Sequence, residues 1–187
     1  MKKKLLALSL FALILSTSII ITILPSFITQ GISRTVIKKE ISLPLILDNA
    51  QEIELIFFGY AGCINICTPR LESIASWYKK LSNKKKVLMR FVDISVPQDK
   101  TLPQAFAQAF DKDFAGVYLN DNDVRVYSRP FEVYFSQSLL DKTEFDHSTN
   151  LYLLKREGKK KYIRYIYSSY PFDFKQISLD IQELLDE

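Results

Sequence analysis

Hydrophobic residues along the chain follow two periods, and the clearest signals are neighbours in the sequence. Unbroken apolar runs at residues 53–60 and 87–94 are typical of strands that are buried on both faces. Between these runs, apolar residues within 70–81 recur at the spacing of one helical face and predict a helix. A strand, a helix and a strand in this order predict a right-handed unit with two parallel strands.

Weaker patterns predict the remaining elements. Strands at residues 148–154 and 161–167 are joined by a Glu157-Gly158 turn and predict a hairpin. Asp173 is placed to cap a final amphipathic helix. The other expected elements are an edge strand within 41–47, a helix capped by Thr101, strands at 117–119 and 133–135, and a helix opened by residues 120–123. Together they predict an α/β fold, with a central mixed sheet flanked by helices.

The first forty residues predict a membrane anchor and a linker. Lysines within residues 1–4 precede an apolar run at 5–24 that matches, at about 1.5 Å per residue, a hydrocarbon core of about 30 Å. The positive-inside rule places these lysines in the cytoplasm. We therefore expect a single-pass transmembrane helix in a bacterial inner membrane, a polar tether at 25–40, and one domain at 41–187 that faces the periplasm or the outside. A cleaved signal peptide is the alternative.

Net charge changes this interpretation little. The chain carries a formal charge of +4, and its lysine triplets at 84–86 and 159–161 lie in expected turns. We interpret the triplets as solvated loop charge and expect no nucleic-acid partner. The sequence also shows no paired-carboxylate, glycine-rich phosphate-binding or Ser-His-Asp pattern. Candidate chemistry therefore has to come from scarcer residues.

The two cysteines, Cys63 and Cys67, lie where the first buried strand meets the first helix. A helix N-terminus favours a thiolate, because its backbone N–H groups are unpaired and carry partial positive charge. A spacing of four residues on a helix brings the Cβ atoms to about 5–6 Å, so the sulfurs can close a disulfide or share a soft metal ion. A purely structural bridge fits poorly, because so short a loop removes little entropy from the unfolded chain.

A single histidine, His147, stands at the start of a predicted strand. Two thiolates and one imidazole are too few for a closed structural zinc site, which usually takes four protein ligands. Thiolate-rich sites of low coordination number suit copper, especially Cu(I). A structural histidine and a structural disulfide remain the plain alternatives for these residues.

Three motifs give the chain a recognisable resemblance. The segments FFGYAGCINIC at 57–67, ISVPQDKT at 94–101 and DHSTNLYLL at 146–154 resemble, in this order, motifs of the Sco family, also called SenC or PrrC. The family has a thioredoxin-like fold and a membrane anchor. It commonly has proline directly after each cysteine, where this chain has Ile64 and Thr68. The first aspartate of the family's segment after the second strand is missing.

The resemblance implies a copper-binding metallochaperone. In this chain it implies that Cys63, Cys67 and His147 bind one copper ion, with Asp146 or Asp99 supporting the ligands. It also implies a role in assembling the binuclear copper centre of cytochrome c oxidase. The expected partner is the copper-acceptor subunit of that enzyme, or another periplasmic copper or thiol protein.

Two alternatives use the same cysteines without copper. In a thiol–disulfide oxidoreductase, Cys63 attacks a substrate disulfide and Cys67 resolves the mixed disulfide. In a structural or redox-sensing module, the two cysteines form a permanent disulfide.

Overall fold

The chain divides into two units, residues 1–34 and 35–187, and each is described by itself. The computed structural model describes residues 13–18, 34–43, 51–139 and 145–187. Residues 13–18 are helical, and most of the anchor expected at 5–24 lies outside the described residues. Within the described part of the chain, no helix is long and apolar enough to cross a membrane.

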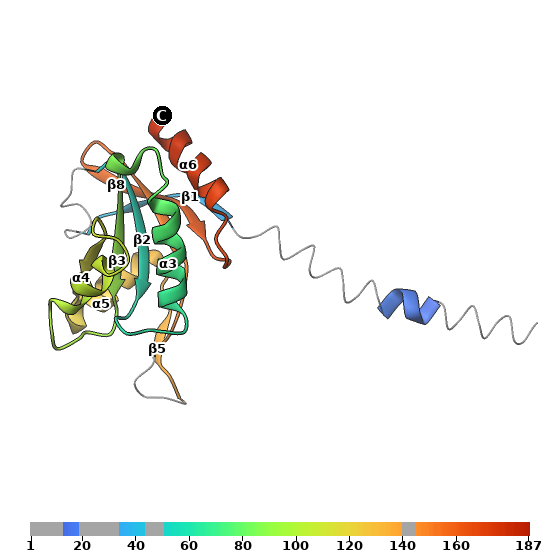
Figure 1. Cartoon of the computed structure of the whole chain (residues 1–187), viewed down its shortest axis with the longest axis horizontal. Coiled ribbons are helices and arrows are strands. Elements are labelled where there is room, and N and C mark those ends of the chain that lie inside the picture. Colours follow the sequence, from blue (N-terminus) through green and yellow to red (C-terminus); the bar gives the residue numbers. More distant parts are fainter. Residues whose placement is uncertain (1–12, 19–33, 44–50, 140–144) are drawn as a thin grey trace, which may run out of the picture. The chain divides into compact units, whose positions relative to one another are not determined.

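A six-stranded mixed sheet forms the centre of the second unit (Figure 1). Its strand order is β1-β8-β7-β2-β3-β4. Strands β2, β3 and β4 run parallel, and β7 runs antiparallel to both β2 and β8. The strands are β1 (Arg34–Ile41), β2 (Ile53–Gly59), β3 (Val87–Asp93), β4 (Ala115–Val117), β7 (Leu151–Glu157) and β8 (Lys160–Tyr167).

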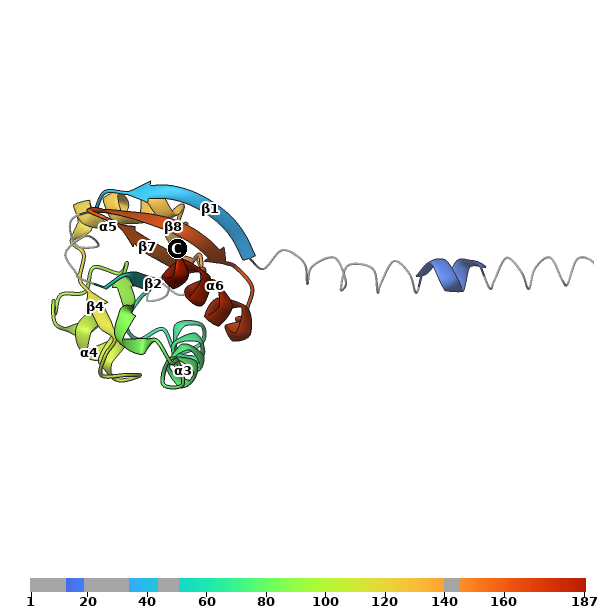
Figure 2. The same cartoon turned by 90° about the horizontal axis from the view of Figure 1, so that it is seen from above.

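Helices cover both faces of this sheet (Figure 2). Side chains alternate along β2, so that Leu55 and Phe57 join one apolar cluster and Ile56 and Phe58 join the other. The first cluster takes side chains from α3, α4 and α6, and the second takes them from α5. The helices are α3 (Cys67–Tyr78), α4 (Leu102–Gln108), α5 (Asp121–Ser128) and α6 (Phe174–Asp186), with short 3₁₀ turns at Lys84–Lys86 and Arg129–Phe131.

The unit built from β2, α3 and β3 confirms the parallel strand-helix-strand prediction, and β7 with β8 confirms the hairpin. The first helix begins at Cys67, three residues before the predicted start, because Pro69 fits within its first turn. The caps of α5 and α6 are as predicted, with Asn120 accepting from Asp123 N–H at 3.0 Å and Asp173 accepting from Gln176 N–H at 3.0 Å.

Strand β1 lies earlier than the edge strand expected within 41–47, most of which is outside the described residues. It occupies the last part of the stretch 25–40 for which a polar tether was expected. Lys38 and Glu40 of β1 pair with Glu157 and Lys160 at 2.8 and 2.9 Å. Charged, exposed positions are usual on edge strands, and they give this strand the composition of a linker.

A second, two-stranded sheet is formed by β5 (Phe135–Gln137) and β6 (Phe145–His147), which are antiparallel. The sequence predicted one strand over 148–154, and that prediction is wrong at its start. His147 ends β6, and β7 begins only at Leu151. Figure 1 shows β5 at the same edge of the domain as the loop from β2 to α3. The histidine is therefore carried by the small sheet, and the cysteines by the loop after β2 and the start of α3.

A buried charge cluster crosses the middle of the main sheet. Glu54 of β2 accepts hydrogen bonds from Arg90 of β3 and from Lys161 of β8. Glu54 and Lys161 are each only 1% exposed. Burial lowers the pKa of Lys161, and the attraction of Glu54 opposes that change. The carboxylate thus balances two cations that water does not reach freely.

Candidate metal centre

The loop after β2 is a tight turn that presents Cys63. Cys63 N–H donates to Tyr60 O at 3.2 Å, and Cys63 O accepts from Thr68 N–H at 3.1 Å and from Thr68 Oγ1 at 3.0 Å. Gly62 adopts a φ of 94°, a conformation that residues other than glycine rarely adopt. Hydrogen bonds from the N–H and to the carbonyl of Cys63 therefore fix its backbone in the loop before α3.

Cys67 is the first residue of α3, and its backbone N–H points at the other sulfur. Cys67 N–H donates to Cys63 Sγ at 3.2 Å, as expected for an unpaired donor at a helix N-terminus. The two residues are 4% and 0% exposed. The sequence prediction of a cysteine pair at a strand-to-helix junction is confirmed, with α3 starting at the second cysteine.

His147 faces the cysteines from β6. Its Nε2 atom lies 3.5 Å from Cys67 Sγ, and its Nδ1–H donates to Ser148 O at 2.9 Å. A carbonyl oxygen can only accept, so Nδ1 carries the proton and Nε2 presents a free lone pair. The Tyr60 ring packs edge-on against the imidazole, with ring centres 6.0 Å apart. The ring is thus held in the tautomer that a metal ligand requires.

The three donor atoms lie within 4.8 Å of one another. Among the described residues they form a group of two sulfurs and one imidazole nitrogen. Soft thiolate ligands and a low ligand number suit Cu(I), and the group lacks the fourth ligand of a closed structural zinc site. The donor set therefore fits a soft metal ion of low ligand number, such as Cu(I).

The two cysteines hold their protons very differently. The hydrogen bond from the Cys67 side chain is the main reason that the pKa of Cys63 lies well below its ordinary value, and burial opposes this effect. The same hydrogen bond, with burial and the nearby negative charge, raises the pKa of Cys67, and Arg70 opposes this rise. Cys63 is thus the thiolate of the pair at neutral pH, while Cys67 keeps its proton.

Comparison with known proteins places this arrangement in a family. The family model described as SCO1/SenC matches residues 48–185, which include the whole candidate centre. The chain belongs to the SCO1/SenC family. The resemblance drawn from the three sequence motifs is confirmed, and so is the thioredoxin-like fold with its mixed sheet between helices.

Individual members of the SCO1/SenC family are distant relatives of this chain. A SCO2-like protein of Rickettsia conorii is 26% identical over 122 residues, which cover 62% of this chain and 58% of that protein. Apo Sco1 of Thermus thermophilus has a TM-score of 0.62 at 21% identity and covers 82% of this chain and 93% of its own. Copper-bound yeast Sco1 has a TM-score of 0.61 at 20% identity, with 81% and 87% covered. These structures share the fold, and the chain spans little more than half the length of its curated relative.

The two carboxylates that were expected to support the ligands are both exposed in this SCO1/SenC protein. Asp146 is exposed on β6, where alternation directs its side chain away from the face that carries His147. Asp99 is exposed and accepts from Thr101 N–H at 2.8 Å and Thr101 Oγ1 at 2.7 Å. Those hydrogen bonds lower the pKa of Asp99. The ligand group among the described residues includes neither carboxylate.

Asp93 and Gly59 are site-building residues that the sequence did not single out. Asp93 ends β3 and is fully buried, and it hydrogen-bonds the loop before Cys63. The available signal was an acidic residue at the end of an otherwise apolar buried strand. Gly59 ends β2 beneath Cys67, where a Cβ atom would lie 2.7 Å from Cys67 Sγ.

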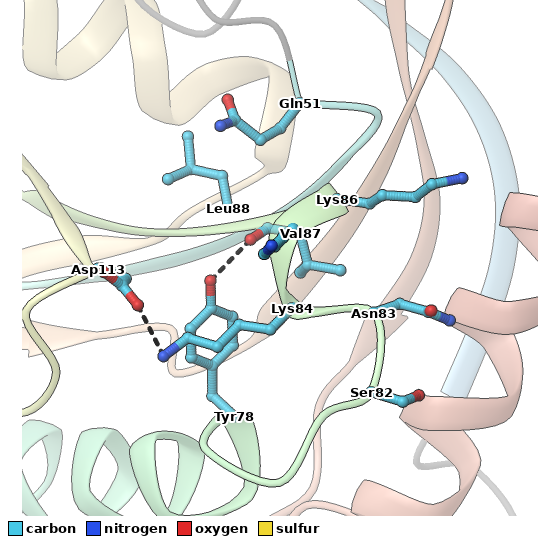
Figure 3. Close-up of a pocket in the computed structure, with 10 residues that line it drawn as sticks. Gln51, Tyr78, Ser82, Asn83, Lys84, Lys86, Val87, Leu88 and Asp113 are labelled. Atoms are coloured by element: carbon cyan, nitrogen blue, oxygen red, sulfur yellow. Dashed lines mark hydrogen bonds and ion pairs between the residues drawn. The ribbon is translucent and has the colours of Figure 1, made fainter.

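A cavity of about 810 Å³ lies at the opposite end of the sheet, beside the first residues of β2 and β3 (Figure 3). In it, Lys84 Nζ lies 2.7 Å from Asp113 Oδ2, and Tyr78 OH donates to Val87 O at 2.7 Å. Burial, with two nearby aspartates, raises the pKa of Tyr78 to about 12. The cysteines follow the opposite end of β2, so this cavity is no part of the candidate metal centre.

Replacing Gly59 with alanine is expected to disturb Cys67 directly. The new methyl group would lie 2.7 Å from Cys67 Sγ and 3.0 Å from the Phe91 ring, so the sulfur has to turn away. Overpacking of this kind typically costs about 1–3 kcal/mol. We expect weaker metal binding together with a lower midpoint in urea. A variant that keeps both properties would show that Cys67 Sγ has room to move.

Proposed function

We propose that this protein is a copper metallochaperone that carries one copper ion on Cys63, Cys67 and His147. The observation that carries the proposal is the convergence of three soft donor atoms within 4.8 Å, with the histidine held in its ligating tautomer. Copper in this proposal is cargo, and a group of only three protein ligands would suit a carrier, because a further ligand from an acceptor could add to the ion.

The residues have distinct roles in loading. Cys63 supplies a thiolate that exists before the metal arrives, because its pKa is low. Cys67 has to release its proton to solvent as the ion binds, and the ion then takes the place of that proton on the sulfur. His147 contributes a neutral nitrogen and keeps its second hydrogen bond to Ser148 O. Two thiolates and a neutral imidazole around Cu(I) leave one net negative charge in the centre.

We further propose that the cargo supports assembly of the binuclear copper centre of cytochrome c oxidase. Membership of the SCO1/SenC family supports this role, and so does the copper held by yeast Sco1 in its crystal structure. The apolar run at 5–24 would anchor the protein in the inner membrane, with the copper-binding domain on the periplasmic or outer side. The acceptor would then be a copper subunit, or another thiol protein, on that side.

A second candidate function is thiol–disulfide exchange. The unequal protonation of the cysteines favours it, because a low-pKa Cys63 is the attacking thiolate and a protonated Cys67 can resolve the mixed disulfide. Each cycle would move two electrons from the cysteine pair to a substrate disulfide. His147 is not needed as a ligand in this chemistry, so the two functions predict different consequences of its loss.

Copper titration of the reduced full-length protein tests the proposal. Cu(I) should bind at one ion per chain in competition with a chelator, and Cu(II) should give sulfur charge-transfer absorption. Failure to hold copper against the chelator, with cysteines that still cycle between thiol and disulfide, would reject the chaperone and favour the oxidoreductase. Thiol labelling of the protein as isolated checks the remaining alternative, since a permanent disulfide leaves no thiol to label.

A further inference from the structure

Asp93 is a buried carboxylate that the ligand group does not use. It is the last residue of β3, is 0% exposed, and pairs in parallel register with Gly59 at the end of β2. An ionisable side chain without exposure is unfavourable unless its hydrogen bonds are satisfied. Its partners therefore indicate what the residue does.

Both oxygens of Asp93 accept hydrogen bonds, and the donors come from two different loops. Oδ2 accepts from Ala61 N–H at 2.9 Å. Oδ1 accepts from Ser95 N–H at 2.8 Å and from Ser95 Oγ at 2.7 Å. Ala61 belongs to the turn that leads into Cys63, and Ser95 belongs to the loop after β3. The carboxylate is thus a bridge between the loops that leave two neighbouring parallel strands.

The loop on the Ser95 side is itself in an uncommon conformation. Val96 has a φ of 52°, which is unfavourable for a β-branched residue and persists only where surrounding contacts determine it. Ser95 is held to Asp93 through both its backbone and its hydroxyl group. Ile94 N–H adds a bond to Gly59 O at 2.8 Å. Asp93 therefore joins the Ala61 turn to the loop after β3, whose backbone is itself held by the hydrogen bonds of Ile94 and Ser95.

We propose that Asp93 is a positioning residue for the cysteine pair. It holds Ala61, and the chain reaches Cys63 two residues later, so the carboxylate sets where the Cys63 sulfur lies relative to Cys67 N–H and to His147. This role deepens the proposed copper function and rests on it for the metal readout only. The placement of the two sulfurs can be measured without any metal.

The carboxylate cannot be replaced by an amide of the same shape. An asparagine side chain has one acceptor oxygen and one donating NH₂ group, whereas all three partners of Asp93 are donors. In Asp93→Asn, the NH₂ group has to face either the Ala61 N–H or the two donors of Ser95. One end of the bridge is lost in either orientation.

The test compares Asp93→Asn with two further variants in the full-length protein. Ser95→Ala removes only the hydroxyl donor and leaves the bond to Ala61, so it should act more weakly in the same direction. Asp111→Asn is the matched control. Asp111 is also buried and accepts a backbone N–H, from Asp113 at 3.0 Å, but it lies beside Lys84, which precedes β3, at the end of the sheet away from the cysteines.

Three quantities are measured for each variant: Cu(I) affinity, the equilibrium of the metal-free cysteine pair with glutathione, and the thermal midpoint. Asp93→Asn should weaken copper binding by about 10-fold or more, as is typical when a residue that orients a ligand is changed. The glutathione equilibrium should shift toward the disulfide by about 3-fold or more, because the reduced pair loses its fixed hydrogen bond from Cys67 N–H. Asp111→Asn should lower the thermal midpoint and leave the other two values unchanged.

Two results would overturn the proposal. One is an Asp93→Asn protein with unchanged copper affinity and unchanged glutathione equilibrium. The other is an equal loss in Asp111→Asn at an equal drop in thermal midpoint, which would make the effect one of general stability. If Asp93→Asn does not fold, Ser95→Ala provides the test. Wild-type copper affinity and a wild-type glutathione equilibrium in Ser95→Ala would count against the positioning role of Asp93. Absence of copper binding in the wild-type protein would reject the proposed function, and the glutathione equilibrium would still test Asp93.

Discussion

His147→Ala is expected to lower the affinity for Cu(I) by more than about 100-fold, beyond the range of about 10–100-fold that is usual for residues that only orient a ligand. The variant removes one of three donor atoms in a group whose members lie within 4.8 Å of one another. The two sulfurs remain, so weak binding should persist. Competition with a Cu(I) chelator measures the loss, and circular dichroism should show an unchanged fold, because the imidazole is only partly buried.

Asp146→Ala is the companion variant for this experiment. Asp146 is the neighbour of His147 on β6, and its exposed side chain is directed away from the face that carries the imidazole. We expect copper affinity within about 3-fold of wild type, since surface substitutions usually act weakly. Equal, large losses of copper affinity in both variants would mean that binding depends on the structure of the β5–β6 sheet rather than on the imidazole. Unchanged copper affinity in His147→Ala would show that His147 is not a copper ligand. The function would then depend on the two cysteines alone.

Glu54→Gln is expected to cost about 3–5 kcal/mol of unfolding free energy, the usual result when one partner of a buried ion pair is removed. The glutamine has nearly the same shape but no charge, so Arg90 and Lys161 lose the carboxylate that balances them. Lys161 is 1% exposed and cannot turn to water without opening the sheet. Urea unfolding followed by fluorescence measures the change.

Glu132→Gln provides the contrast for Glu54→Gln. Glu132 pairs with Lys39 at 2.9 Å, and its side chain is 83% exposed. Exposed ion pairs contribute at most about 1 kcal/mol, because water and salt screen them. A cost at Glu54 no larger than that at Glu132 would show that water reaches the buried cluster, or that Lys161 gives up its proton easily.

The elements that the sequence predicted well are those whose burial leaves a regular pattern. Strand β2 is buried at every position, so its continuous apolar run was unambiguous, and the parallel unit followed from it. Strand β6 is only three residues long and is stabilised by antiparallel pairing with β5. Its own sequence is too short to show an alternating pattern of apolar and polar residues. Strand β1 was hidden by the charged residues that an edge strand carries.

The candidate metal centre was predictable in its members but not in its supports. Cys63 and Cys67 are the two cysteines of the chain and His147 is its one histidine, and their scarcity made them stand out. The supporting contacts of Ser148 and Asp93 leave no periodic signal, because His147 meets the backbone carbonyl of the next residue and Asp93 meets a loop 32 residues away. The carboxylates at 99 and 146 match the motifs in sequence, yet in space they face solvent.

The order in which the ligands emerge during synthesis follows from the eighty residues that separate Cys67 from His147. The ribosome releases both cysteines well before the histidine, and translation proceeds at about 5–20 residues per second. For several seconds a nascent chain offers two sulfurs and no imidazole. During that time an oxidant could join the sulfurs, or a stray metal ion could bind to them alone. The complete group can form only after β6 has been made, so a filled three-ligand centre would mark a chain in which β6 has reached the cysteine loop.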